Sequence, residues 1–364
     1  MSMSDYYKAK NLKPSRDTIK VIFTGGTIGS LATGDNISPD SEAKYLLLNK
    51  YKEQTHKDTI RFDTTSPMSI LSENAVPNDV LKMAKAIRQA ESEGVKGIIM
   101  THGSDTLACS SAYLGLLLSD IKVPVVLVAS NLILTNEKAN GVDNFETAVN
   151  LIDCGVKPNV YVAYKNPEDD FTSIHLGTRM NEPAPMSDSF YSPEGLRFAT
   201  HKNGKIVYEN TSIPKPQTFK LLDKEFDAKY LSIHPQTGLN YDVFDVDKFD
   251  YVVHGLYHSG TANTREDYPS HNSINFAMKC KEHNKPFYLC NIKKKDVNYD
   301  STNKMKNAGM DFMYGILPNV AEAKLNIAYS LLPQNLRDKY LSTNINGENI
   351  EEMEKENNYE IEMI

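Results

Sequence analysis

Two short segments of the sequence gather hydroxyl and carboxylate side chains beside glycines. Residues 24–29 are Thr-Gly-Gly-Thr-Ile-Gly, and residues 101–106 are Thr-His-Gly-Ser-Asp-Thr. A Thr or Ser hydroxyl can attack a carbonyl carbon when a neighbouring group removes its proton and backbone N–H groups stabilise the oxyanion. Glycine lets the backbone turn sharply and approach a ligand closely. The two segments therefore indicate acyl transfer, with Thr27 as the predicted nucleophile.

Each segment also has an ordinary structural explanation. Gly, Thr and Ser are common where a strand turns into a helix, because they cap the helix. Glycines ahead of a helix also suit a phosphate. However, residues 24–29 contain neither Gly-x-Gly-x-x-Gly nor the Lys-Ser/Thr of a P-loop. The chain also has no Gly-x-Ser-x-Gly elbow of the α/β-hydrolases. Two such segments at one edge of a sheet favour chemistry over capping.

Both segments follow apolar runs that are typical of buried strands, residues 19–23 and 97–100. Between these runs, residues 78–90 repeat apolar side chains every three to four positions, which predicts a helix. Further strands are expected at 123–129 and 159–164, and further helices at 106–118 and 144–154. This alternation predicts an α/β fold, a doubly wound and mostly parallel sheet with helices on both faces. In such sheets ligands bind beyond the carboxyl ends of the strands, where both segments lie.

The 364 residues suggest one large or two ordinary domains. We expect a larger N-terminal α/β catalytic domain at 18–211 that ends in a hairpin of residues 196–200 and 205–208. A linker at 212–226 would lead to a smaller C-terminal α/β domain at 227–335. Its predicted strands lie near 230–233, 251–256 and 287–292, and its predicted helices lie near 270–283 and 320–332. An acidic tail at 336–364 follows, which we expect to be frayed from Asn344 onward.

The composition limits the partners and the compartment. The formal net charge is −7, from 40 Lys and Arg against 47 Asp and Glu, so no nucleic acid or membrane partner is expected. The N-terminus does not resemble a secretory signal, and no apolar stretch of about 18 residues predicts a membrane span. The four cysteines form no Cys-x-x-Cys pair, so we expect reduced thiols in a cytoplasmic protein. The spacing of His254, His258 and His271 fits no zinc motif, and no metal is expected.

The two segments resemble the signature motifs of the bacterial-type L-asparaginase family, which includes the glutaminase-asparaginases. That family has Thr-Gly-Gly-Thr-Ile near its N-terminus and His-Gly-Thr-Asp-Thr about a third of the way along. The resemblance covers roughly residues 20–332, in the family's two-domain order. It implies hydrolysis of a small amino-acid amide without a cofactor. It also implies a homo-oligomer, a dimer or a tetramer.

The resemblance assigns catalytic roles to three residues. Thr27 matches the first catalytic threonine of the family, the nucleophile. Ser104 falls where the family has its second catalytic threonine, and it keeps the hydroxyl. Asp105 matches the aspartate that binds the amino group of the substrate and belongs to the second triad.

The resemblance also implies a set of substrate-binding residues. Ser72 and Glu73 resemble the pair that holds the α-carboxylate and α-amino groups of the substrate. Gly26 and Gly103 would line the substrate with their backbones.

Two departures from the family concern proton transfer. The family has a catalytic tyrosine in the mobile loop after the first motif, whereas residues 31–39 contain none and Tyr45 lies further along. The family also has a lysine in its second triad, and by our alignment Asn181 takes its place. Arg179 is nearby, but a guanidinium stays protonated and cannot serve as a base. Lys165 could substitute for the lysine in space.

His258 and Ser259 follow a predicted strand of the second domain. The simplest interpretation is a turn, because Ser, Gly and Asn dominate turns. In the family, the matching strand end reaches the active site of a neighbouring subunit, which gives both residues a possible role.

We therefore expect an amidohydrolase that converts L-asparagine to L-aspartate and ammonia with a threonine nucleophile. A glutaminase-asparaginase or another small-amide hydrolase is the alternative among enzymes. A catalytically impaired amino-acid-binding homologue is the alternative among binding proteins.

Overall fold

The computed structural model describes residues 17–33, 36–39, 43–57, 59–295 and 297–351, and for residues 30–44 it describes the backbone only. The predictions for the extreme N-terminus and for tail residues 352–364 lie outside the described residues. The chain forms two compact units. The first runs to Gly177 and then takes in Glu182–Glu209, and the second comprises Thr178–Asn181 and the chain from Asn210 onward. The expected α/β class is confirmed.

The first unit is built on an eight-stranded sheet with the order β10-β9-β8-β7-β6-β5-β1-β4. Neighbouring strands from β4 to β7 pair in parallel, while β8, β9 and β10 extend the sheet in antiparallel fashion. The parallel strands are β4 (Arg61–Thr65), β1 (Thr18–Phe23), β5 (Gly97–Thr101), β6 (Val125–Val128) and β7 (Val160–Tyr164). The antiparallel strands are β8 (Thr172–Leu176), β9 (Ala199–Lys202) and β10 (Lys205–Tyr208). The predicted parallel strands and the C-terminal hairpin are confirmed.

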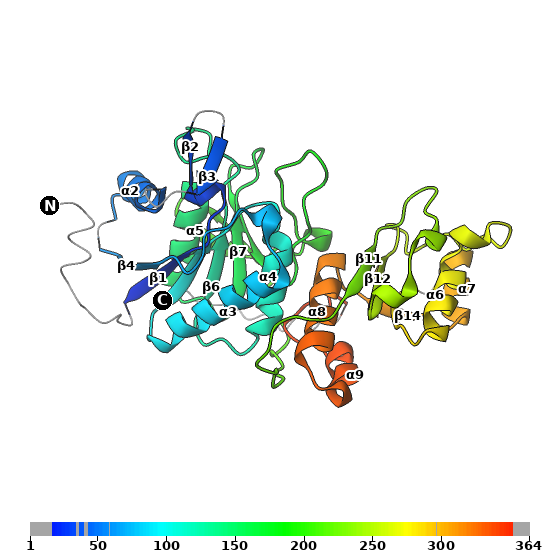
Figure 1. Ribbon diagram of the computed structural model, residues 1–364. Helices are drawn as coiled ribbons and strands as arrows, with labels where there is room; N and C mark the ends of the chain where they lie inside the picture. Colours follow the sequence, from blue (N-terminus) through cyan, green and yellow to red (C-terminus); the bar gives the residue numbers. More distant parts are fainter. Residues whose placement is uncertain (1–16, 34–35, 40–42, 58, 296, 352–364) are drawn as a thin grey trace. The chain divides into compact units, whose positions relative to one another are not determined.

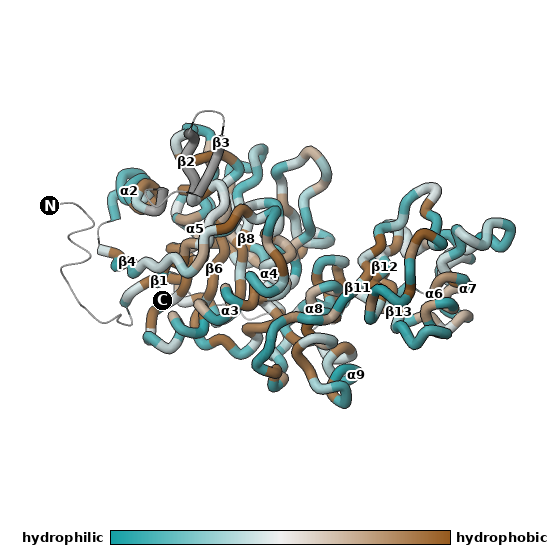
Figure 2. Tube along the Cα trace, viewed as in Figure 1, coloured by the Kyte–Doolittle hydropathy of each residue, from teal (hydrophilic) through white to brown (hydrophobic). Residues whose placement is uncertain are grey.

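Helices cover both faces of this sheet (Figure 1). α3 (Pro77–Ser92) packs beside α4 (Leu107–Leu117), and α5 (Gly141–Asp153) packs beside α2 (Ala43–Thr55) on the other face. Pro77 is the first residue of α3, where its fixed φ and missing N–H cost nothing. Figure 2 shows hydrophobic colours along the central strands and hydrophilic colours on the outer turns of α2. The helices thus bury the sheet as the alternating sequence predicts.

A hairpin and a helix that were not predicted follow the first motif. β2 (Ser30–Thr33) pairs with β3 (Asn36–Pro39) in antiparallel fashion, and α2 comes next. Tyr51 of α2 is fully buried, and its ring packs edge-on against Phe62 and Phe145. This aromatic cluster fixes α2 on the sheet.

The second unit has a four-stranded parallel sheet with the order β11-β12-β13-β14. Its strands are β11 (Tyr230–Ile233), β12 (Tyr251–Gly255), β13 (Phe287–Ile292) and β14 (Asp311–Tyr314). Its helices are α6 (Ser273–Glu282), α7 (Asp300–Asn307), α8 (Pro318–Leu331) and α9 (Gln334–Ser342). The predicted strands and helices are confirmed, whereas β14, α7 and α9 were not predicted. β14 is a short edge strand with one fully buried side chain, so its sequence carries little periodicity.

The expectation of a frayed tail from Asn344 is wrong for the segment that the structure describes. α9 and the residues after it belong to the second unit, and Ile345, Asn346 and Glu348 are buried. The tail is ordered because the Glu348 carboxylate accepts hydrogen bonds from two backbone amides and pairs with a buried lysine. No helix in the described part of the chain is long and apolar enough to cross a membrane.

Candidate active site

The first motif and the second motif lie at the point where the sheet reverses its strand order. From β1 the chain passes to β4 on one side and then to β5 on the other, so β1 and β5 are neighbours with diverging connections. A crevice outside the carboxyl ends of such strands is the usual ligand site of an open α/β sheet. The 3-10 turn η1 (Thr27–Gly29) comes just after β1, and residues 102–106 join β5 to α4.

The two motifs meet backbone to backbone. Gly25 and Gly26 have φ of 107° and 76°, a region that L side chains rarely adopt. A Cβ added to Gly26 would lie 2.4 Å from the backbone N of Gly103. The amide of Gly26 also donates to Ile70 O at 3.3 Å, and the amide of Ile70 donates to Thr24 O at 2.9 Å. Glycine is therefore required where the first motif touches the second.

A third segment, η2 (Ser72–Asn74), packs against the same place. A Cβ on Gly103 would lie 2.3 Å from Ser72 Oγ. Ser72 Oγ donates to Asp105 Oδ2 at 3.4 Å, and Thr106 Oγ1 donates to Ser72 O at 3.0 Å. The structure thus brings three separate segments together in the first unit.

The exposure of the predicted site residues differs in a useful way. Ser72, Gly26 and Gly103 are buried, Thr27 and Ser104 are half-buried, and Glu73 and Asp105 are exposed. Buried groups form the floor, while the hydroxyls and carboxylates remain accessible. This arrangement can present a nucleophile and two anionic groups to a small cationic or zwitterionic ligand.

Two threonines of the motifs have roles that the sequence did not predict. Thr24 Oγ1 donates to Thr101 O at 2.6 Å, which ties the end of β1 to the end of β5. Thr106 ties the start of α4 to Ser72. A hydroxyl at the edge of a strand or helix is the signal that could have identified both.

His102 lies inside the second motif and is fully buried. Its Nδ1 lies 2.7 Å from Gly103 O, so Nδ1 carries the proton and donates it to that carbonyl. Burial lowers the pKa of His102, and the bond to Gly103 raises it less. A neutral imidazole that holds the Gly103 turn fits the structural role expected for His102.

The helix that carries Tyr45 lies beside the first motif. α2 begins at Ala43, and both α2 and β3 contact η1. The segment after the first motif therefore folds back onto the turn of Thr27.

Lys165 is held away from the motifs. It follows β7, which is separated from β5 by β6, so at about 4.8 Å per strand its backbone is about 10 Å from β5. Its Nζ pairs with Asp143 Oδ2 at 2.7 Å, on the first turn of α5. The structure therefore disfavours Lys165 as a substitute for the family's lysine.

Arg179 and Asn181 belong to the second unit. Arg179 is 1% exposed, and its Nε donates to Gly347 O. Burial lowers its pKa to about 10, and Glu348 raises it less, so the guanidinium is protonated at neutral pH. Asn181 is half-buried. The structure gives Arg179 a structural contact and leaves the role of Asn181 a prediction.

His258 and Ser259 form part of a turn after β12 in the second unit. His258 is exposed, Ser259 Oγ lies 2.9 Å from Thr261 Oγ1, and Gly260 has φ of 78°. These features fit the turn interpretation. Among the residues that the structure describes, no three His, Cys, Asp or Glu side chains cluster as metal ligands.

The fold and the site define an α/β protein that gathers hydroxyls and carboxylates at the switch point of its larger sheet. The family model described as "Asparaginase, N-terminal" matches residues 18–214. The chain therefore belongs to the asparaginase family.

Solved structures with the same fold include two L-asparaginases. The thermostable L-asparaginase from Thermococcus kodakarensis matches with a TM-score of 0.72 and 23% identity, over 91% of this chain and 98% of that chain. L-asparaginase I from Vibrio cholerae O1 biovar eltor matches with a TM-score of 0.69 and 17% identity, over 90% and 97%. These likenesses show the asparaginase fold.

The curated relatives have a different name, because they are subunits of glutamyl-tRNA(Gln) amidotransferases. The relative from Saccharolobus solfataricus is 25% identical over 259 residues, which are 68% of this chain and 56% of the relative. The relative from Sulfolobus acidocaldarius is 25% identical over 350 residues, 91% of this chain and 75% of the relative. The chain thus spans little more than half the length of the first relative. Family and fold together support an amidohydrolase.

Proposed function

We propose that the chain hydrolyses L-asparagine to L-aspartate and ammonia with Thr27 as the nucleophile. The observation that carries the proposal is the convergence of three segments at the switch point of the sheet. Gly26 abuts Gly103, Gly103 abuts Ser72, and Ser72 Oγ contacts Asp105. The turn of Thr27 is thereby joined to the hydroxyl and carboxylate groups of the other two segments.

The chemistry follows from the residue types. The Thr27 hydroxyl attacks the side-chain carbonyl carbon, the C–N bond breaks, and ammonia leaves with the transferred proton. Water then hydrolyses the resulting ester and releases aspartate. Backbone N–H groups near Ser104 stabilise the oxyanion in each step.

The substrate's charges suit the exposed and buried groups. The α-ammonium would pair with the accessible carboxylates of Asp105 and Glu73, and the α-carboxylate would accept a hydrogen bond from Ser72. As the group that receives the Thr27 proton we propose Tyr45. The contact of α2 with η1 supports this choice. We also propose a cytoplasmic homo-oligomer.

A second candidate is favoured by the names of the curated relatives, which are subunits of a glutamyl-tRNA(Gln) amidotransferase. In this candidate the same site releases ammonia from a glutamine side chain, and a partner protein uses that ammonia. The site chemistry is unchanged, while the substrate is one methylene longer and the chain acts in a hetero-complex.

One assay tests both candidates. Purified protein is incubated separately with asparagine, glutamine and other small amides, and the ammonia released is measured for wild type, Thr27→Ala and the control Thr200→Ala. Thr200 is half-buried like Thr27 but lies on β9. We expect activity on asparagine that is lost in Thr27→Ala and kept in the control. Ammonia from glutamine alone would favour the second candidate. Unchanged activity of Thr27→Ala would exclude this nucleophile, and binding of amides without turnover would indicate a binding protein.

A further inference from the structure

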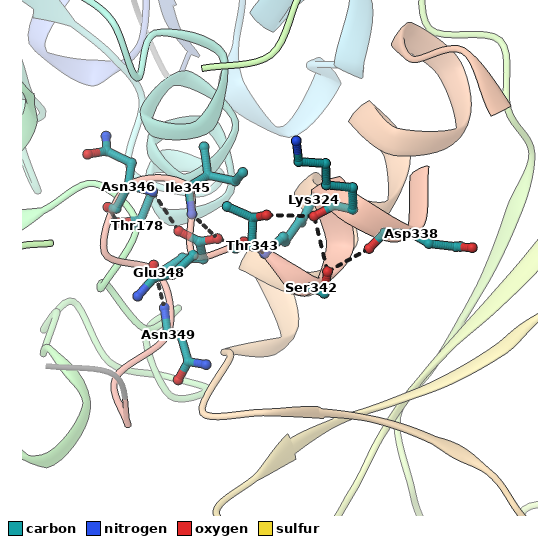
Figure 3. Close-up of polar contacts among 11 residues, drawn as sticks. Thr178, Lys324, Asp338, Ser342, Thr343, Ile345, Asn346, Glu348 and Asn349 are labelled. Atoms are coloured by element: carbon teal, nitrogen blue, oxygen red, sulfur yellow. Dashed lines mark hydrogen bonds and ion pairs between the residues drawn. The ribbon is translucent and has the colours of Figure 1, made fainter. Parts of the chain in front are cut away.

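The last described residues of the chain fold into a closed loop that we call the C-terminal clasp, residues 343–348. The carboxylate of Glu348 closes it: Oε1 accepts from the amide of Ile345 at 2.8 Å, and Oε2 accepts from the amide of Asn346 at 2.7 Å (Figure 3). The side chain of Glu348 is fully buried. One carboxylate therefore caps both amides of its own loop.

A buried lysine locks the clasp onto α8. Lys324 Nζ donates to Glu348 Oε1 at 2.7 Å and to Thr343 O at 2.6 Å. The side chains of the pair are 1% and 0% exposed. A buried charge that loses its partner is strongly destabilising, so each of the two groups requires the other. The clasp is consequently held in one conformation.

The clasp holds the crossover Thr178–Asn181, the short segment of the second unit that interrupts the first. Thr178 Oγ1 donates to Asn346 O at 2.9 Å, and Arg179 Nε donates to Gly347 O. Figure 3 shows Thr178 beside Asn346, with the carboxylate of Glu348 directed into the loop. The carbonyls that Glu348 orients are thus the acceptors for the crossover.

The residue just before the crossover is anchored in the first unit. Ser111 Oγ donates to Gly177 O at 3.0 Å, and a Cβ on Gly177 would lie 2.9 Å from Ser111 O. Ser111 is in α4, the helix that begins directly after Ser104 and Asp105. Two consecutive residues, Gly177 and Thr178, are therefore held by one hydroxyl hydrogen bond each. One bond comes from the helix of the proposed site and the other goes to the clasp.

We propose that the clasp is a positioning element for the reaction. It fixes Thr178, the chain fixes Gly177 in turn, and Gly177 sets the place of α4, which carries Ser104 and Asp105 at its N-terminus. Glu348, Lys324 and Thr178 are positioning residues that touch no substrate. The inference rests on the proposed function for its effect on catalysis. The ordering of the crossover by the clasp is a separate physical property.

The test compares two buried threonines of the second unit. Thr178→Val removes the donor to the clasp, and the control Thr302→Val removes an equivalent donor, the 2.7 Å bond of Thr302 Oγ1 to Gly260 O. Thr178 and Thr302 are each 1% exposed. We expect Thr178→Val to lower kcat about tenfold or more with KM within about twofold, since small misplacements of reacting groups act on kcat. Thr302→Val should keep kcat, and Thr178→Ser should restore it.

Hydrogen exchange gives a readout that does not depend on activity. Amides 177–181 should exchange faster in Thr178→Val and in Glu348→Gln, and the double variant should add little to either. Equal kcat in the two valine variants, or unchanged exchange at the crossover, would overturn the proposal. If wild type releases no ammonia from any amide, the proposed function fails. The exchange comparison then still decides whether the clasp orders the crossover, and its milder variant keeps the test valid where Glu348→Gln does not fold.

Discussion

Ser72 Oγ and Asp105 Oδ2 lie 3.4 Å apart although 33 residues separate them in the chain. The contact joins a turn that follows β4 to the turn that follows β5. With the adjoining contact of Gly103, it makes one surface from segments that the sequence keeps apart. An amino acid bound there would meet a hydroxyl and a carboxylate whose positions depend on each other.

This dependence predicts a coupled effect on substrate binding. Ser72→Ala and Asp105→Asn should each raise KM for asparagine about tenfold, because each removes one hydrogen-bonding group of the binding site. The double variant should raise KM by less than the product, since each single change already disturbs the other residue. Steady-state kinetics of the four proteins measure the coupling. Ser92→Ala, on an exposed side chain of α3, is the control that should behave as wild type. Fully multiplicative effects would mean that the two groups act independently.

A second prediction concerns the contact between the motifs. Gly103→Ala places a Cβ where Ser72 Oγ already lies, 2.3 Å away, so one segment must move. We expect a loss of about 100-fold in kcat/KM, the effect of a displacement of about 1 Å in a preorganised site. The control is Gly255→Ala in the second unit, where the new Cβ would meet Ile233 O at an ordinary 3.5 Å. Similar activity of both variants would show that the site tolerates the shift.

The sequence predicted the parts of the fold that have a period and missed the parts that depend on distant partners. The strands before both motifs were predictable because they are continuous apolar runs. β8 was missed because Thr172, Ser173 and His175 look polar, yet all three are buried, and His175 Nδ1 lies 2.8 Å from Ser192 Oγ. The tail was mispredicted because the buried lysine that neutralises Glu348 is 24 residues away.

The candidate site was predictable to a similar degree. Glycine-rich turns after apolar runs locate the carboxyl edge of a sheet, so the meeting of Gly26 and Gly103 follows from topology. The place of Ser72 came only from resemblance, because nothing local indicates that residue 72 reaches Gly103. The ion pair that engages Lys165 was not predictable, because it depends on how α5 packs beside β7.

That ion pair yields a third prediction. Lys165→Met should change kcat by less than about threefold, because the lysine is paired with Asp143 and removal of a positioned general base would cost about 100-fold or more. Tyr45→Phe should lower kcat at least about tenfold if the tyrosine hydroxyl receives the Thr27 proton. Ammonia release at saturating asparagine measures both. A large loss in Lys165→Met combined with normal activity of Tyr45→Phe would reverse the assignment.

The buried histidines predict how stability depends on pH. Burial lowers the pKa of His254 to about 4, with a smaller effect from His234, and it lowers the pKa of His175 to about 3, with a smaller effect from Arg197. In the unfolded chain both have a pKa near about 6.5. Their contribution to stability is therefore complete above a pH of about 6.5 and is lost progressively as the pH falls toward the folded values, because only the unfolded chain takes up the protons.

The expected loss is large enough to measure in each unit. Between a pH of about 6.5 and about 4.5, each histidine should lower the free energy of unfolding by about 2–3 kcal/mol, at about 1.4 kcal/mol per pH unit. Urea denaturation at a series of pH values checks this. His254→Gln keeps a side chain that can bond the hydroxyl of Tyr241, which lies 2.8 Å from His254 Nε2, and it should reduce the proton uptake on unfolding by about one. His283→Gln alters an exposed ring and should leave the slope unchanged. An equal slope in wild type and His254→Gln would mean that His254 is protonated in the folded protein.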